Sequence, residues 1–287
     1  ANYKFVATNG NATINELTFT VNSVSDSISS LTVDGKTAAV VGSSVTLTGL
    51  NKEVIAGLQG TNIEVLASYI PVTSSGQGGV GTYATSSLTL TTVKYTVNGV
   101  QSTKTGLSVS SNAMVVVASY PTVTLAEGNP AGMSSGYLAG ADSELLRFKV
   151  ANSNSSNPIN LRTITITPTY SGTLASTTAQ KIKVYDASDL NTVLGEASVG
   201  TSGTAAKITF TSDSVITSEK TYVVKADTSG LTSDGNSIRL SLTSSDTYVG
   251  LGTSTAGDWA WNDSTVSNYA NGYLVKNLPL NGNTMVK

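Results

Sequence analysis

Carboxylate pairs are the strongest candidates for chemistry in this sequence. Three pairs of Asp residues lie close together along the chain: Asp186 with Asp189, Asp227 with Asp234, and Asp258 with Asp263. Paired carboxylates serve as general acid and base in hydrolases, and their oxygens bind Ca²⁺. None of these pairs has the spacing of a known calcium loop, and Asp in a turn commonly bonds to the neighbouring backbone. We therefore expect these residues to cap turns, and we predict no catalytic and no metal-binding residues.

The sequence contains no histidine and no cysteine. Without His, it has no Ser-His-Asp or Cys-His arrangement, no imidazole metal site and no imidazole base. Without Cys, it has no disulfide, no thiolate nucleophile and no zinc–thiolate site. A lysine–asparagine isopeptide cross-link, with Lys4 or Lys149 on an opening strand, would need a buried acid, and the sequence identifies none. We predict that the protein is not an enzyme and uses no cofactor.

Aromatic residues are densest near the end of the sequence, at Trp259, Trp261, Tyr269 and Tyr273. Trp259 and Trp261 lie two residues apart, so on a strand they would share a face. Such a face could stack against sugars or contact another subunit. The alternative is a plug in the core of the last sandwich, because aromatic side chains bury the largest apolar area. The four residues are candidate interface aromatics.

Three Asn-x-Ser/Thr sequons begin at Asn11, Asn154 and Asn262. All three fall in predicted turns or loops, where a glycan has room. They are candidate glycosylation sites, although chance also explains three sequons in a chain so rich in Asn, Ser and Thr.

The composition predicts an all-β protein. Ser and Thr make up 82 of the 287 residues, and only 12% are charged. β-branched residues that alternate with small polar ones favour half-buried strands. Turn signals such as Asn98-Gly99 separate the alternating runs, as in hairpins.

The opening of the chain occurs twice. Lys4-Phe5-Val6-Ala7 precedes a polar turn and an alternating strand at 14–21, and Arg147-Phe148-Lys149-Val150 precedes a polar turn and a strand at 159–166. This repeat predicts two tandem antiparallel immunoglobulin-like β-sandwich domains. We expect the first sandwich at 1–126, a linker rich in Gly, Pro and Ser at 127–143, and the second sandwich at 144–287.

The charge pattern does not favour binding to nucleic acid. The net charge is −2 and no basic run occurs, so we expect no nucleic-acid partner. No apolar run is long enough to span a membrane. Low charge, no Cys and many Ser, Thr, Gly and Asn are typical of secreted microbial surface proteins. We expect an extracellular or cell-surface protein in its mature form, after removal of an export signal.

The repeated opening and the two-sandwich layout resemble tandem immunoglobulin-like domains of prokaryotic cell-surface proteins, which include pilus and filament subunits, S-layer proteins and adhesin stalks. The closing segments Trp259-Ala260-Trp261-Asn262-Asp263 and Asn271-Gly272-Tyr273-Leu274-Val275-Lys276-Asn277-Leu278-Pro279 resemble domain ends in Ser/Thr-rich surface proteins of uncultured bacteria. The resemblance implies export and a structural role. It assigns no functional residues.

These features predict a structural subunit of an extracellular filament or pilus that assembles head to tail with copies of itself. The expected mechanism is β-strand addition, in which a strand of one molecule completes a sheet of the next. The candidate donor strand is residues 1–8, with Tyr3, Phe5 and Ala7 on one face. The alternative is that this strand pairs within its own domain. Other candidate functions are an S-layer protein, and an adhesin or carbohydrate-binding module that binds glycans through the loop at 74–81 or the aromatic tail.

Overall fold

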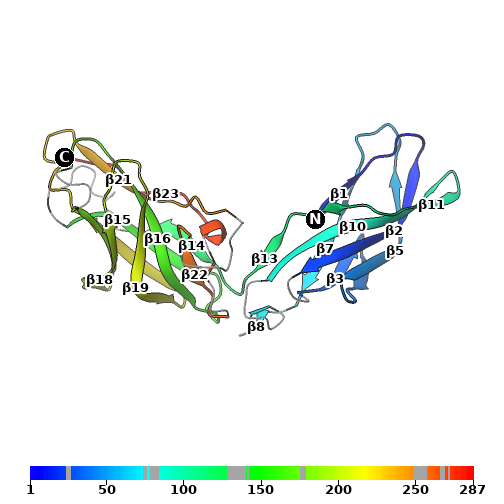
Figure 1. Ribbon diagram of the computed structural model, residues 1–287, viewed down its shortest axis with the longest axis horizontal. Helices are drawn as coiled ribbons and strands as arrows, with labels where there is room; N and C mark the ends of the chain where they lie inside the picture. Colours follow the sequence, from blue (N-terminus) through cyan, green and yellow to red (C-terminus); the bar gives the residue numbers. More distant parts are fainter. Residues whose placement is uncertain are drawn as a thin grey trace. The chain divides into compact units, whose positions relative to one another are not determined.

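The computed structural model describes residues 1–23, 27–70, 72–73, 76–77, 84–127, 140, 142–174, 179–247, 257–265, 269–270 and 272–287. Within these ranges the secondary structure is β-strand, apart from one short 3-10 helix, η2 (Gly272–Leu274). The chain divides into two compact units, residues 1–117 and 118–287. Antiparallel sheets form a sandwich-like arrangement in each unit (Figure 1). The predicted all-β fold with two tandem sandwiches is confirmed. The described part of the chain holds no helix that is long and apolar enough to cross a membrane.

One layer of the first unit is built around its second strand, β2 (Ala12–Ser23). β2 lies between β5 (Ser44–Val54) and β10 (Ala84–Val97), and all three are long strands. The other edge of β10 pairs with three shorter strands: β11 (Val100–Lys104), β12 (Val109–Ser110) and β13 (Met114–Val116).

The other layer of the first unit contains the opening strand. β1 (Asn2–Phe5) pairs with β6 (Thr61–Glu64), and only Val65 separates β6 from β7 (Leu66–Tyr69). β7 pairs with β3 (Ile28–Val33), which also pairs with β4 (Lys36–Ala39). A separate small hairpin is formed by β8 (Val72–Thr73) and β9 (Gly76–Gln77).

The second unit has two layers of similar design. The order of the first layer is β14-β15-β20-β17-β18, and that of the second is β19-β16-β21-β23, with β22 on β16 and β24 on β21. The strands are β14 (Pro121–Leu125), β15 (Ser143–Asn152), β16 (Ile159–Tyr170), β17 (Lys181–Asp186), β18 (Asp189–Ser198), β19 (Ala206–Ile216), β20 (Glu219–Ala226), β21 (Ser237–Leu242), β22 (Ala260–Asn262), β23 (Leu280–Asn281) and β24 (Met285–Val286).

The two units share one topology. We number the shared strands of each unit by their order, and count β6 and β7 together as the sixth strand, which corresponds to β20. The first strand (β1 or β15) pairs with the sixth. The third strand (β3 or β17) pairs with the sixth and also with the fourth (β4 or β18). In each, the second strand (β2 or β16) lies between the fifth (β5 or β19) and the seventh (β10 or β21). Strand pairing therefore supports the repeat that the sequence suggested.

The residue-by-residue correspondence differs from the one that the sequence suggested. Ile14 and Leu161 are equivalent, because each stands directly before a register shift, typical of a β-bulge, against the fifth strand. Comparison of the sequences matched Ile14 with Ile159 instead. With the structural match, β1 and β15 also end at equivalent residues, Phe5 and Asn152. The two matches differ by two residues, and side-chain direction along a strand repeats every two residues, so the sequence pattern alone does not distinguish them.

The boundary between the units lies earlier than expected. The sequence placed residues 118–126 in the first sandwich, but residues 121–125 form β14, which pairs with β15 of the second unit. Most of the expected linker at 127–143 lies outside the described residues, and Ser143 already belongs to β15.

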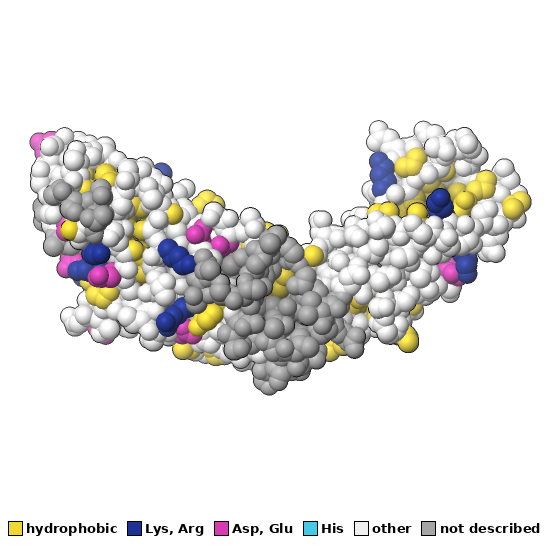
Figure 2. Space-filling view, viewed as in Figure 1, with side chains coloured by type: hydrophobic (Ala, Val, Ile, Leu, Met, Phe, Trp, Pro, Cys, Tyr) yellow, Lys and Arg dark blue, Asp and Glu magenta, His cyan; other side chains and the backbone are white. Residues whose placement is uncertain are grey.

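The cores of both units contain aromatic pairs between strands. The ring centroids of Tyr3 and Phe19 are 5.3 Å apart in the first unit, and those of Phe148 and Tyr222 are 5.2 Å apart in the second. Charged side chains are sparse on the face of the molecule drawn in Figure 2. The folds therefore depend mainly on apolar burial and on strand pairing.

Candidate interaction site

One edge of the first strand, β1, has no partner strand in the part of the chain that the structure describes. The backbones of Ala1 and Val65 exchange two hydrogen bonds of 2.7 Å each, so Ala1, Tyr3 and Phe5 direct their backbone groups toward β6. Backbone direction alternates along a strand. Asn2, Lys4 and Val6 therefore point their N–H and C=O groups away from β6. No described strand pairs with that second edge. Unpaired edges of this kind are templates for another strand.

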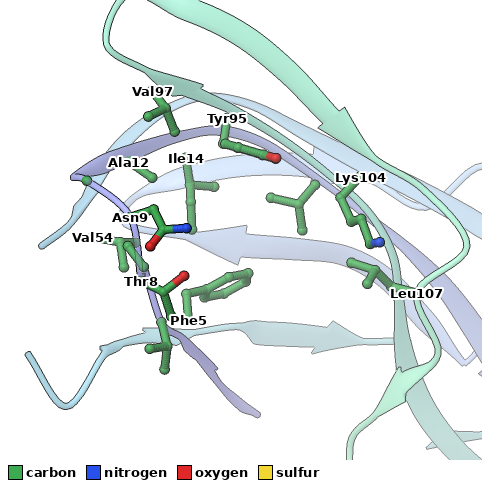
Figure 3. A pocket seen from close by; sticks show the side chains of 14 residues that line it. Phe5, Thr8, Asn9, Ala12, Ile14, Val54, Tyr95, Val97, Lys104 and Leu107 are labelled. Atoms are coloured by element: carbon green, nitrogen blue, oxygen red, sulfur yellow. The ribbon is translucent and has the colours of Figure 1, made fainter. Parts of the chain in front are cut away.

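A cavity of about 490 Å³ opens beside this edge, between the two layers of the first unit (Figure 3). Its apolar lining comes from several strands, and Thr8, Asn9 and Lys104 supply polar groups. The apolar lining residues are Phe5, Val6, Ala7, Ala12, Ile14, Val54, Val93, Tyr95, Val97 and Leu107. Val6, at the cavity and on the free edge, is 60% exposed. The site thus combines an unpaired backbone edge with an apolar hollow.

In the second unit the equivalent edge is covered. β14 lies antiparallel on β15, and the Ala126 N–H donates to the Arg147 carbonyl over 3.0 Å. The side chain of Val123, in the middle of β14, is fully buried. A parallel bridge joins Thr122 to Lys276, which places the chain's tail on the outer side of β14. The second unit therefore has a strand, β14, at an edge where the described part of the first unit has none.

The chain just before β14 covers the end of the second sandwich. The Ser153 N–H donates to the Tyr120 carbonyl over 3.2 Å, and the Tyr120 N–H donates to Ser153 Oγ over 2.9 Å. Asn154 Nδ2 donates to the Ala118 carbonyl (3.1 Å), and Ser119 Oγ donates to the Asn157 carbonyl (2.9 Å). Residues 153–157 are the counterparts of residues 6–10, which line the open cavity in the first unit. The same place is therefore occupied in one unit and open in the other.

Trp261 fills the core of the second unit at the position that Tyr95 occupies in the first. Trp261 pairs with Leu161 across β22 and β16, and Tyr95 pairs with Ile14 across β10 and β2. Trp261 is fully buried, whereas Tyr95 is only half-buried and lines the cavity. The larger indole closes the second sandwich at the place where the first remains open.

The candidate interface aromatics are mostly part of the structure of the second unit. Trp259 is fully buried like Trp261, and its indole Nε1 donates to the Thr243 carbonyl over 2.8 Å. The prediction of a tryptophan interface was wrong, and the core plug that we kept as the alternative is what the structure has. The Tyr269 hydroxyl donates to Asp213 (2.9 and 3.0 Å), and burial together with this carboxylate raises the pKa of Tyr269. Only Tyr273, at 57% exposure, is mainly open to solvent.

The candidate donor strand lies in its own sheet. Tyr3 is 4% exposed and its hydroxyl donates to the Leu88 carbonyl over 2.8 Å. Burial raises the pKa of Tyr3, and hydrogen bonds to Ser111 partly offset this effect. Phe5 and Ala7 are half-buried beside the same core. The structure thus shows the alternative arrangement, in which residues 1–8 complete their own unit, and donation to another copy has no support here.

The three sequons differ in accessibility. Asn11 is exposed, at the turn between β1 and β2. Asn154 is half-buried and its amide nitrogen is engaged with the Ala118 carbonyl. Asn262 is 6% exposed and accepts hydrogen bonds from Asn160 and from the Ser264 N–H. Its prediction as a glycosylation site was wrong, because β22 turns the side chain inward.

Four of the six paired carboxylates cap turns, as the sequence predicted, whereas Asp258 accepts the N–H of the distant Ser245 over 2.6 Å. Each of Asp186, Asp189, Asp227 and Asp263 accepts the N–H of the residue two places on. Within the described ranges no three acidic side chains gather where they could hold a metal ion. The lysines considered for a cross-link are on the surface: Lys4 is exposed and Lys149 Nζ lies 3.0 Å from Glu219.

Two organising roles escaped the sequence analysis. Asp246 accepts the N–H groups of Asp258, Trp259 and Gly272 at 2.8–3.0 Å, which holds the tail together. Asp263 also accepts the Ala118 N–H over 2.7 Å, which ties the start of the second unit to its end. Partners this distant in sequence leave no local pattern.

No family model matches the chain, and no curated protein matches it. Among solved structures, the collagen adhesin of S. aureus aligns at 10% identity over 100% of this chain and 88% of its own, with a TM-score of 0.19. A structure described as manganese lipoxygenase of Gaeumannomyces graminis with part of zonadhesin of Komagataella pastoris aligns at 12% identity over 86% of this chain and 80% of its own, with a TM-score of 0.17. At these TM-scores the alignments do not establish a common fold.

Proposed function

We propose that the protein is a structural subunit of an extracellular filament or pilus, which polymerises with copies of itself through β-strand addition. One observation carries this proposal. The edge of β1 and the cavity beside it are open in the first unit, and the equivalent place in the second unit is covered by residues 118–125. A sheet edge that another strand completes is a common device for joining extracellular subunits.

The physical chemistry of the open edge supports assembly. Soluble proteins protect sheet edges with short strands, charges, proline or bulges. Here the edge is short and carries Lys4, which limits uncontrolled pairing, but an apolar hollow lies directly beside it. Exposed apolar surface of this kind usually marks an interaction site. A partner that covered the edge and the hollow would bury both at once.

The extracellular setting is part of the proposal and rests on composition. A chain with 12% charged residues, no Cys and 82 Ser or Thr residues suits an exported, structural protein. The same composition also suits an S-layer protein, so the experiment has to distinguish a filament from a two-dimensional sheet.

Electron microscopy of the purified native material tests the proposal. Filaments of regular repeat are the expected result, and reconstruction would place β1 at the contact between subunits. Two-dimensional sheets would replace the filament by an S-layer. Monodisperse monomers at every concentration, confirmed by sedimentation velocity, would overturn the assembly role altogether.

A further inference from the structure

We infer that the β1 edge and its cavity form an acceptor site for one extended peptide strand of a partner polypeptide. The strand lies antiparallel to β1 and places a large apolar side chain in the cavity. This inference deepens the proposed function and rests on it. It names the acceptor surface and the chemistry of the strand that fits it.

The second unit gives the register of the incoming strand. The groups that face β14 there belong to Lys149, Ala151 and Ser153, whose counterparts are Asn2, Lys4 and Val6. A strand in the same register would therefore bond to the backbones of Asn2 and Lys4, and then to Val6. No described strand of the first unit pairs with these groups.

The cavity sets the side-chain requirement. In the second unit Ser119 is buried against Asn157, the counterpart of Gly10. The preceding residue, Ala118, donates its N–H to Asp263, two residues after the fully buried Trp261. The first unit has Tyr95 in place of Trp261, and a cavity of about 490 Å³ remains. A serine side chain would leave most of this cavity empty, so the residues that line it would lack van der Waals contacts. The incoming strand therefore carries a side chain of the size of Leu or Phe at the position equivalent to Ser119.

Other kinds of ligand would use either the cavity or the backbone groups of the β1 edge, but not both. A small apolar ligand would fill the cavity but leave the backbone groups of Asn2, Lys4 and Val6 bonded to water. A second sheet pairing edge to edge with β1 would use those groups but leave the cavity open. An extended peptide with one anchoring side chain uses both, in the manner of strand-addition complexes.

Synthetic peptides of the chain's own covering segment provide the probe. We take residues 118–126, Ala-Ser-Tyr-Pro-Thr-Val-Thr-Leu-Ala, and the same peptide with S119L, each with a fluorescent label. Binding to the full chain is measured by fluorescence polarisation. The S119L peptide is expected to bind at least about tenfold more tightly, because burial of a Leu side chain adds apolar contact. A peptide that also carries T124P is expected to lose binding, since the Thr124 N–H is one that faces the acceptor strand.

Variants of the full chain locate the binding. Lys4→Pro removes an N–H that faces the open edge and makes no bond to β6, so the fold is expected to persist and peptide binding to be lost. Lys4→Ala is the matched control, because it keeps the N–H and removes only an exposed side chain, and it should bind as the wild type does. Tyr95→Trp introduces the indole that closes the second unit. It should remove the advantage of the S119L peptide without loss of thermal stability.

Two results would overturn the inference: equal affinity of the two peptides, or equal binding by the wild type and by Lys4→Pro that is shown to be folded by circular dichroism. A small-molecule site would appear as binding of hydrophobic dyes that Lys4→Pro does not alter. Failure here is distinct from failure of the proposed function. Filaments without peptide binding would remove the acceptor site, whereas peptide binding by a protein that never polymerises would remove the filament.

Discussion

Tyr95 and Trp261 are structural counterparts in the two units. Each lies on the strand that pairs with the second strand of its unit, opposite Ile14 and Leu161 respectively. Trp261 is fully buried, and Tyr95 borders a cavity of about 490 Å³. One exchange of an aromatic side chain thus accompanies the difference between a closed sandwich and an open one.

Removal of the closing indole should cost the second unit much of its stability. We expect Trp261→Ala to lower the free energy of unfolding by about 3–5 kcal/mol, because it deletes a fully buried aromatic side chain and leaves a cavity. Urea denaturation followed by circular dichroism measures the change. Tyr273→Ala is the control, since Tyr273 is 57% exposed, and it should shift the transition little. Similar losses for both variants would contradict the assignment of Trp261 as a core residue.

The fold was predictable from the sequence because it rests on local patterns. Alternating strands and the Asn98-Gly99 turn are local signals, and the structure has β10 and β11 on either side of that turn. The position of β14 was not predictable, because residues 121–125 would alternate in the same way in either unit. Their partner on β15 is chosen by packing between segments distant in the sequence.

The candidate site was predictable only in part. The sequence singled out the first strand but presented it as a donor, whereas in the structure no described strand covers its outer edge. That difference depends on β6, which lies some sixty residues downstream and pairs with β1. The inward orientation of Trp261 likewise depends on β16, which pairs with β22, and Trp259 is held by hydrogen bonds to Asp246 and Thr243. An aromatic pair on one face of a strand looks the same in sequence whether that face meets a core or a partner.

The carboxylate of Asp263 should link the start of the second unit to its end. It accepts the N–H groups of Ala118 (2.7 Å) and Thr265 (3.1 Å) and is fully buried. We expect Asp263→Ala to lower the free energy of unfolding by about 1–3 kcal/mol, because buried donors lose their acceptor. Hydrogen exchange measured by mass spectrometry should show faster exchange in residues 118–126. Unchanged exchange in that segment would show that the carboxylate does not hold it.

Acid should weaken the second unit partly through Asp186. Burial alone would raise the pKa of this carboxyl, but hydrogen bonds from Ser188 and the ammonium of Lys220 outweigh it, so the pKa is below its usual value of 3.8. The folded state therefore binds fewer protons than the unfolded state near pH 4, and stability falls as the pH drops through this region. Asp186→Asn should lose about 1 kcal/mol or less at pH 7, since solvent screens the pair. The free energy of unfolding of this variant should also decrease less than that of the wild type as the pH is lowered from 6 to 2.5, as measured by urea denaturation. An equally steep fall in the variant would assign the acid sensitivity to other groups.

Alkaline solution should weaken the second unit through Tyr222. Burial raises the pKa of this phenol well above its usual value of 10.0, the hydrogen bond with Ser214 opposes the rise, and the charge of Asp186 adds to it. Above pH 10 the unfolded chain loses the proton while the folded chain keeps it, so stability falls with rising pH. The free energy of unfolding from this group then falls by up to about 1.4 kcal/mol per pH unit.

We expect the wild type to lose stability faster than Tyr222→Phe between pH 9 and pH 11.5 in urea denaturation. Tyr273→Phe is the control and should follow the wild type, because Tyr273 is largely exposed. Parallel pH profiles for the wild type and Tyr222→Phe would mean that the buried phenol does not set the alkaline limit.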